Sequence, residues 1–172
     1  DPVDLMHKVE YIFRNPNDQR RTPEEIVRDA LYDKSGLVSP GSLADAIARL
    51  TVQDPKKYRI ATTNFDTCVE TALTGYLSSS VEDLACGIRA SKPWFANKKP
   101  RPHVLHLHGM VTPHSGHVIT PLILSESHFR RFGEKVQSKI EKIIRESHVV
   151  FVGVSLTDPN LLGPLHNLRK TR

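Results

Sequence analysis

The chain carries two alternating hydrophobic patterns, one with helical and one with strand spacing. Apolar residues three and four positions apart predict amphipathic helices. These fall at residues 3–13, 22–32, 43–50, 67–77 and 134–146, with a shorter one that begins at Ser125 or Ser127 and a last one after Asp158–Pro159. Two of the helices open on residues typical of a capping box, Thr22 with Glu25 and Thr67 with Glu70.

Strand-like runs stand between these helices, over residues 58–63, 103–108, 118–124 and 149–154. The last of them is continuously apolar, which is typical of a strand buried on both faces of a sheet. Strands that alternate with helices favour a parallel sheet with helices on both faces. We therefore expect an α/β, Rossmann-like fold in a single domain over residues 1–172, with the proline-containing residues 78–102 forming a long surface loop.

Composition places the chain among ordinary globular proteins. Its 172 residues are 38% hydrophobic and 25% charged, enough to bury one core. No apolar run approaches the ~20 residues of a membrane span, and residues 1–4 do not open a signal peptide, so we expect a cytoplasmic protein. The formal charge of +5 suits attraction to a dinucleotide pyrophosphate. No nucleic-acid-binding signature occurs, and direct nucleic-acid binding is not expected.

Cysteine and histidine could both signal a metal. Cys68 and Cys86 are too few for a disulfide framework and form no Cys-x-x-Cys pair, so we expect two small buried residues and no zinc module. A histidine-rich stretch leaves a metal hydrolase open as an alternative, with His103, His106, His108, His114 and His117 inside fifteen positions. No carboxylate-rich motif accompanies that stretch, and we expect no metal.

Polar residues follow three of the predicted strands. In open parallel sheets, ligands bind outside the carboxyl ends of the strands, where such residues converge. The three groups are Thr63, Asn64 and Asp66; His106, His108 and Gly109; and Gly153, Ser155 and Asp158. Their expected meeting at one edge of the sheet predicts a functional site.

The first group combines an amide with a carboxylate. Asp66 could simply cap the helix that follows it. Because Thr67 and Glu70 already have the form of a capping box, Asn64 is not needed for that purpose. Its amide both donates and accepts, which suits holding a water or a sugar hydroxyl.

The other two groups suit proton transfer and phosphate binding. His106 and His108 share one face of the predicted strand, and His106 is expected to be structural. His108 stands beside a glycine at the strand end, where a neutral imidazole could accept a proton near pH 7. Residues 153–159 suit a turn with a helix cap, a ribose- or phosphate-binding surface at a helix N-terminus, or both.

Four ordered motifs resemble those of sirtuin-like domains: TTNFD at 62–66, LHLHG at 105–109, PLILSESHF at 121–129 and FVGVSLTDPNLL at 151–162. They are most similar to the bacterial branch found in anti-phage defence proteins, and the resemblance extends to the N-terminal helices. No Gly-x-Gly dinucleotide fingerprint occurs in the chain. The family's glycine-rich strand and loop would precede Asp1, so we expect a fragment truncated at both ends.

The resemblance implies a Rossmann-like fold that binds NAD and assigns roles to individual residues. Asn64 matches the asparagine that positions the reactive water or ribose, Asp66 the acidic residue of the nicotinamide pocket, and His108 the general base toward the ribose hydroxyls. Gly153 and Ser155 match the Gly-x-Ser that contacts the cofactor's ribose and phosphate. Thr63 is then a neighbour of the cofactor.

The expected activity is NAD+ glycohydrolysis in anti-phage defence by NAD depletion, without a metal. The cysteine pairs of the deacylating sirtuins are absent, yet an NAD-dependent deacylase stays open as an alternative. So does a non-catalytic module for NAD or nucleotide sensing or for oligomerisation. The expected partners are NAD, a C-terminal sensor or partner domain or subunit, and further copies of the chain.

Overall fold

The computed structural model describes residues 11, 22–32, 35–36, 38–89, 102–114, 117–154 and 158–170. The chain divides into two compact units. The sheet unit spans Tyr11–Leu122, and the helical unit combines Asp1–Glu10 with Ile123–Arg172. The helix predicted over 3–13 lies, apart from Tyr11, outside the described residues. The single domain over 1–172 stays a prediction.

The first helix of the sheet unit begins where its capping box predicts. Helix α2 spans Pro23–Leu31 with Thr22 as N-cap. Thr22 Oγ1 accepts the Glu25 N–H at 3.2 Å, and Glu25 Oε2 accepts the Thr22 N–H at 2.6 Å. The box is therefore confirmed in both of its hydrogen bonds.

The unit's second helix is longer than predicted. Helix α3 spans Ser42–Gln53 and buries Ala44, Ala48 and Thr51, which follow one another at helical spacing. These small side chains allow close packing against helix α4, Cys68–Thr74. Helix α4 ends earlier than the predicted residue 77, and the C-cap N–H of Gly75 bonds back into the last turn.

Three short parallel strands form the sheet. Their order is β1 (Ile60–Thr62), β3 (Val104–His106), β2 (Ala85–Gly87), so β3 is central, and all three of its residues are buried. The strands are aligned so that His106 is paired with Thr62 on one side and with Gly87 on the other. The predicted α/β, Rossmann-like class is confirmed by this helix-flanked parallel sheet.

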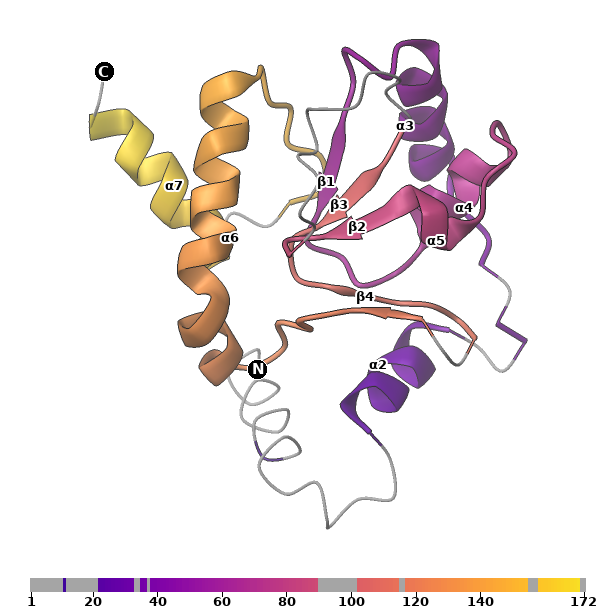
Figure 1. The fold of residues 1–172 in the computed structure, drawn as a ribbon, viewed down its shortest axis with the longest axis horizontal. Helices are drawn as coiled ribbons and strands as arrows, with labels where there is room; N and C mark the ends of the chain where they lie inside the picture. Colours follow the sequence, from indigo (N-terminus) through magenta and orange to yellow (C-terminus); the bar gives the residue numbers. More distant parts are fainter. Residues whose placement is uncertain are drawn as a thin grey trace. The chain divides into compact units, whose positions relative to one another are not determined.

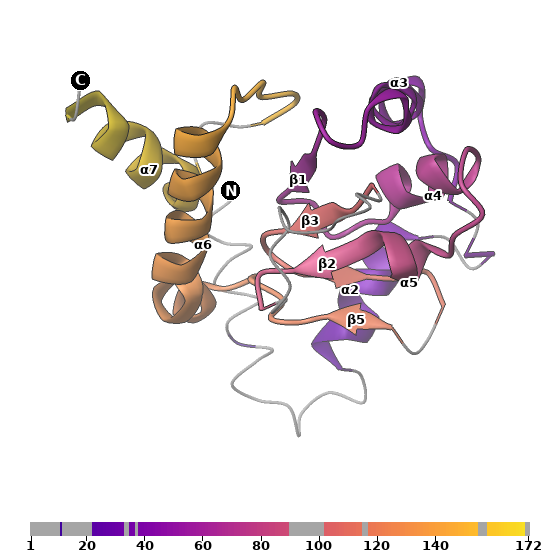
Figure 2. The same ribbon diagram turned by 45° about the horizontal axis from the view of Figure 1, so that its top comes forward.

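Helices α3 and α4 cover one face of the sheet (Figures 1 and 2). The core beneath them is built from small and branched apolar side chains, which belong to α3, α4, β3 and helix α5 (Val81–Leu84). Its buried members are Ala44, Ala48, Ala72, Leu73, Leu84 and Val104. Because side chains alternate along a strand, Val104 and His106 of β3 share this face.

The long loop predicted over 78–102 is wrong for its first half. Ser80 Oγ accepts the Asp83 N–H at 3.1 Å and so caps α5, and β2 follows at once. The proline signal belongs to the later residues, of which 90–101 lie outside the described part of the chain. The buried Leu84 fixes the earlier half against the core.

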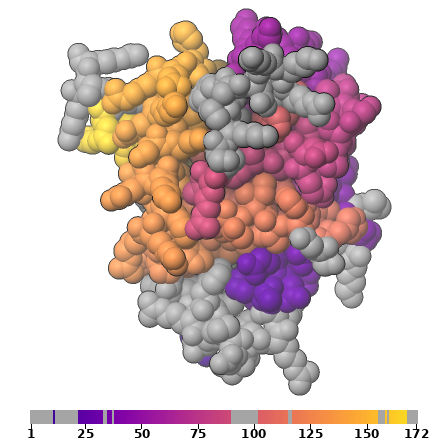
Figure 3. Space-filling view, viewed as in Figure 1, coloured from indigo at the N-terminus to yellow at the C-terminus, as the bar shows by residue number. Residues whose placement is uncertain are grey.

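A small antiparallel ribbon completes the sheet unit. Strand β4 (Met110–Val111) pairs with β5 (Val118–Ile119), which is shorter than the predicted strand over 118–124. Helix α2 lies against β4, whose two residues are buried, and α2 itself lies at the surface (Figure 3, indigo). Arg28 Nε donates to the Thr112 carbonyl at 3.1 Å and so ties α2 to the ribbon.

The described part of the helical unit contains two packed helices. One uninterrupted helix, α6 (Glu126–Glu146), replaces the two predicted there, and Ser125 is its N-cap. Its buried stripe consists of Phe132, Gly133, Val136, Ile140 and Ile143. Helix α7 (Pro159–Lys170) packs against α6, and Gly133 lets Asn160 approach closely.

The strand predicted over 149–154 is wrong. None of these residues is assigned to a strand, and the side chain of Val150 is 84% exposed. Apolar sequence favours a strand only where a neighbouring strand supplies hydrogen bonds. The described residues of the helical unit include no other strand for this segment to pair with. Among the described helices, none is long and apolar enough to cross a membrane.

Candidate functional site

Two of the predicted site segments leave neighbouring strands at the same end of the sheet. Leu107 N–H donates to the Thr62 carbonyl, and Val111 N–H donates to the Phe65 carbonyl, each at 2.9 Å. The residues after β1 therefore run beside the residues after β3. The rings of Phe65 and His108 have centroids 6.4 Å apart, which brings the Asn64–Asp66 turn to the segment that carries His108.

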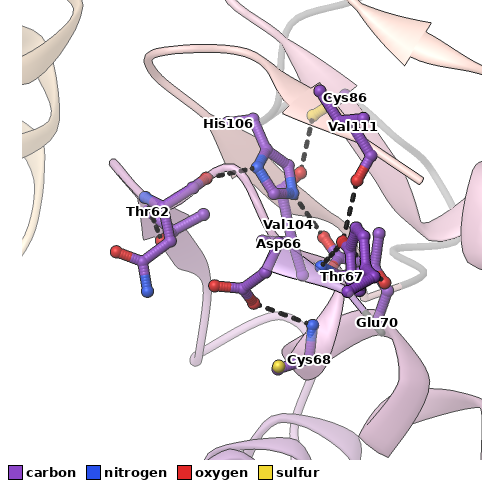
Figure 4. A network of polar contacts seen from close by, with 11 residues as sticks. Thr62, Asp66, Thr67, Cys68, Glu70, Cys86, Val104, His106 and Val111 are labelled. Carbon is purple, nitrogen blue, oxygen red and sulfur yellow. Dashed lines mark hydrogen bonds and ion pairs between the residues drawn. The ribbon is translucent and has the colours of Figure 1, made fainter. Parts of the chain in front are cut away.

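A buried histidine joins these segments to helix α4. His106 Nδ1 lies 3.0 Å from the Asn64 backbone carbonyl, and His106 Nε2 lies 2.6 Å from Glu70 Oε1. Both side chains are essentially excluded from solvent. Figure 4 labels His106 and Glu70, and dashed lines from the two ring nitrogens mark the two contacts of the imidazole. The predicted structural role of His106 is confirmed, with a specific contact to the candidate site.

The two contacts of His106 fix where its hydrogens lie. A carbonyl oxygen only accepts, so Nδ1 carries a hydrogen and donates it to Asn64. A second hydrogen must lie between Nε2 and Glu70 Oε1, because two lone pairs would otherwise face each other at 2.6 Å. The pair thus has no net charge, whichever partner holds that hydrogen. This suits its burial, since an uncompensated buried charge is costly.

Asn64 has a fixed backbone and an exposed side chain. Its N–H donates to Thr62 Oγ1 at 3.0 Å, and its carbonyl accepts from His106. The backbone is held on both sides, so the amide side chain projects from a defined position. Thr63, next to it, is half-buried, and His108 is 5% exposed.

The capping box predicted from Thr67 and Glu70 is wrong. Thr67 makes no side-chain cap, and Asp66 Oδ1 instead accepts the Cys68 N–H at 2.9 Å. Glu70 is drawn away because its carboxyl group pairs with His106. The capping alternative for Asp66 is therefore confirmed, while its role in a nicotinamide pocket stays a prediction.

Both cysteines are half-buried rather than fully buried. Burial raises the pKa of the Cys68 thiol to about 12, and the hydrogen bond and negative charge of Asp66 act in the same direction. The thiol is therefore protonated at neutral pH and is a poor nucleophile. Cys86 lies on β2, with its sulfur 3.5 Å from the Val104 carbonyl.

Tyr32 braces the turn that follows Asp66. Its hydroxyl donates to the Val111 carbonyl at 2.8 Å and accepts the Thr67 N–H at 3.0 Å. The chain after β1 and the β4 strand are thus held by one side chain at the end of α2. Burial raises the pKa of Tyr32, so the hydroxyl keeps its hydrogen and remains a donor.

The third predicted group of polar residues falls in the helical unit and is described by itself. Gly153 belongs to the helical unit, with φ of 61° and open space around it. Ser155 lies outside the described residues. Asp158 is confirmed as a cap, since its Oδ1 accepts the Asn160 N–H at 2.9 Å. Cofactor contacts of Gly153 and Ser155 stay predictions.

The metal-hydrolase alternative counted His106 among its possible metal ligands, and His106 is engaged elsewhere. Both ring nitrogens of His106 are engaged, one by a carbonyl and one by Glu70, so His106 and His108 cannot act together as a metal-binding pair. Within the described residues no cluster of three or more His, Cys, Asp or Glu side chains could hold a metal ion.

Sequence reasoning missed two residues of this network, Glu70 and Tyr32. The sequence pattern predicts Glu70 as part of a local capping box with Thr67. Asp66, one residue before the cap position, accepts a helix N–H in place of that box. Tyr32 had no local signal, because both of its partners are distant in the chain.

A family model for the SIR2-like domain matches residues 58–172. The chain belongs to the SIR2-like domain family. This match includes all four motifs, whereas the resemblance of the N-terminal helices lies before it. Neither a curated protein nor a solved structure matches the chain.

Within this SIR2-like domain, two of the matching motifs contain the tied segments after β1 and β3. The family relates the chain to NAD. The network around His106 therefore lies where a ligand of this family is expected, at the carboxyl ends of parallel strands.

Proposed function

We propose that this SIR2-like domain is an NAD+ glycohydrolase, with Asn64 and His108 as catalytic residues. The observation that carries the proposal is the joining of their two segments at one end of the sheet. The Asn64 carbonyl bonds to His106, two residues before His108, and Phe65 packs near the His108 ring. An amide and an imidazole thus occupy adjacent strand ends.

The residues fit such a substrate in character. The exposed Asn64 amide can donate to and accept from a water or a ribose hydroxyl. His108 lies in a mostly buried position beside an aromatic ring, where a neutral imidazole suits proton uptake. Gly109, with φ of 91°, adopts a conformation that favours glycine and leaves no side chain beside His108.

The reaction consumes one water. The bond between nicotinamide and ribose breaks, its electron pair leaves with nicotinamide, and the nicotinamide becomes neutral. Water oxygen bonds to the ribose carbon, giving ADP-ribose and one released proton. Asn64 would place the water or the ribose, and His108 would take up a proton. Asp66 would orient the nicotinamide, with Thr63, Gly153 and Ser155 as further contacts.

The proposed role in the cell, anti-phage defence, is supported only by the resemblance of the motifs to the anti-phage branch. NAD depletion by this domain would then stop infected cells from supporting a phage. A sensor or partner domain, self-association and a cytoplasmic location belong to the same proposal.

Product analysis tests the activity. The full-length protein is incubated with NAD+, with and without an acyl-lysine peptide, and the products are separated by chromatography. We expect nicotinamide and ADP-ribose in equal amounts, whether or not the peptide is present. Nicotinamide release that requires the peptide would indicate a deacylase instead. Binding of NAD+ without release would indicate a sensing module.

A further inference from the structure

We infer that Glu70 and His106 form a positioning pair that sets the orientation of Asn64, and through it the rate of the chemical step. The inference rests on the proposed function for its kinetic consequence only. Neither residue touches the substrate in this assignment, because both are fully buried. They act through the backbone carbonyl of Asn64.

The contacts run in one line from helix α4 to the turn. Glu70 is carried by α4, whose apolar residues Ala72 and Leu73 belong to the core. Its Oε1 holds His106 Nε2 at 2.6 Å, and His106 Nδ1 holds the Asn64 carbonyl at 3.0 Å. A rigid helix is thereby coupled to an exposed amide, as expected when outer residues orient a functional group.

Glu70 determines which ring nitrogen of His106 acts as the donor to Asn64. An isolated neutral imidazole can carry its hydrogen on either nitrogen. Sharing a hydrogen between Nε2 and Glu70 leaves Nδ1 as a donor, the form that the Asn64 carbonyl requires. Glu70 thus selects the state of His106 that can hold the turn.

One feature argues against a purely stabilising role. Glu70 Oε2 is buried with no hydrogen-bond partner among the described residues. A buried polar atom left in this way reduces stability, and a pair of apolar residues would avoid that loss. Retention of a carboxyl group here is explained if its contact with His106 serves the site.

Two substitutions of His106 can each keep one ring-nitrogen contact and remove the other. Asparagine in place of His106 puts its amide nitrogen where Nδ1 lies, and so keeps the donor to Asn64 while losing Glu70. Glutamine puts its amide nitrogen near Nε2, and so keeps the contact with Glu70 while losing the carbonyl of Asn64. His106→Asn and His106→Gln are therefore a matched pair of variants.

The experiment measures kcat and KM for NAD+ in the full-length protein, together with the carbonyl 13C resonance of Asn64. For His106→Gln we expect kcat to fall by about 100-fold with a smaller change in KM, because a displaced reacting group slows chemistry. The Asn64 resonance should also move. His106→Asn should retain more of kcat and keep the resonance near its original position.

Equal losses in the two variants, with equal shifts of the resonance, would overturn the inference. If neither variant folds, Glu70→Gln and Glu70→Leu replace them. The glutamine amide can donate to His106 Nε2 and should preserve kcat, whereas leucine should lower it. Equal losses for these two would overturn the inference as well.

A wild-type protein that releases no nicotinamide would contradict the proposed function alone. The positioning pair is then decided by the Asn64 resonance, which needs no turnover. A resonance that moves in His106→Gln and not in His106→Asn supports the pair, and an unmoved resonance in both overturns it.

Discussion

Glu70 Oε1 and His106 Nε2 lie 2.6 Å apart in the interior, although 36 positions separate the two residues in the chain. The contact joins helix α4 to the central strand β3 at the level where the strand ends. The same imidazole bonds to the Asn64 carbonyl, so the pair connects the core of the sheet unit to its candidate site.

Removing one partner of this pair should destabilise the protein strongly. Glu70→Ala leaves a buried His106 nitrogen without its partner, and breaking a buried pair in this way costs about 3–5 kcal/mol. Urea unfolding of the full-length protein measures the loss. Glu126→Ala is the control, because its contact with Arg130 is exposed and 3.7 Å long, and its loss should stay within about 1 kcal/mol. Similar losses for both variants would contradict the importance of the pair.

Asp66 should prove to be the cap of α4. Asp66→Ala removes the acceptor of the Cys68 N–H and should lower the free energy of unfolding by about 1 kcal/mol. Asp66→Asn keeps an acceptor oxygen and should remain close to wild type in stability. If Asp66 also orients nicotinamide, the asparagine variant should still lose NAD+ turnover. Equal instability of the two variants would exclude capping as the main role of the side chain.

The raised pKa of Cys68 predicts slow thiol chemistry. Since the pKa is about 12 rather than the ordinary 9.0, the folded protein holds the thiol proton at pH 8, whereas the unfolded chain releases part of it. In a Cys86→Ala background, iodoacetamide should therefore label the folded protein more slowly than the urea-unfolded protein. Asp66→Asn removes a charge that raises this pKa and should speed labelling, with desolvation still opposing it.

The same pKa has a consequence for stability. A group whose folded pKa is raised contributes stability that is fully present below its unfolded pKa. The contribution of Cys68 should therefore be lost as pH rises from about 9 toward 12. The free energy of unfolding of Cys68→Ala should therefore decline less than that of the wild-type protein between pH 9 and pH 12. The same decline in both proteins would contradict the assignment.

Gly109 should tolerate no side chain. Its φ is +91°, and an added Cβ would lie 2.5 Å from the Pro121 carbonyl oxygen and 2.6 Å from that of Ile119. A strained backbone of this kind costs about 1–3 kcal/mol. Because the added Cβ also meets two carbonyl oxygens, Gly109→Ala should lower the free energy of unfolding by about 3 kcal/mol, the upper end of that range. Gly41→Ala is the control, because nothing lies within 4 Å of its added Cβ. Equal melting temperatures for the two variants would contradict the close packing of Gly109.

Elements whose determinants are local could be predicted from the sequence. The box of Thr22 and Glu25 needs only residues three positions apart, and both of its hydrogen bonds are present. The same residue types at Thr67 and Glu70 predicted a second capping box that does not form, because Glu70 pairs with His106, 36 positions away. Local spacing cannot reveal a competition between a near partner and a distant one.

Strand prediction failed where pairing decides the structure. The run 149–154 is more apolar than β1, yet β1 is a strand because β3 supplies its hydrogen bonds. For the candidate site, the rule for parallel sheets correctly placed the Asn64 and His108 segments beside each other. It could not foresee Glu70 or Tyr32, whose roles arise from tertiary contacts alone.

The most direct test of the central claim is the turnover of an etheno-NAD+ substrate by the full-length protein, followed by fluorescence. Asn64→Ala and His108→Ala should each lower turnover by roughly 100-fold or more, as expected for loss of a positioned proton acceptor or water-holding group. The controls are Asn167→Ala on α7 and His117→Ala, an exposed residue of the same histidine-rich stretch, and both should match wild type. Unchanged turnover in Asn64→Ala and His108→Ala would contradict the account.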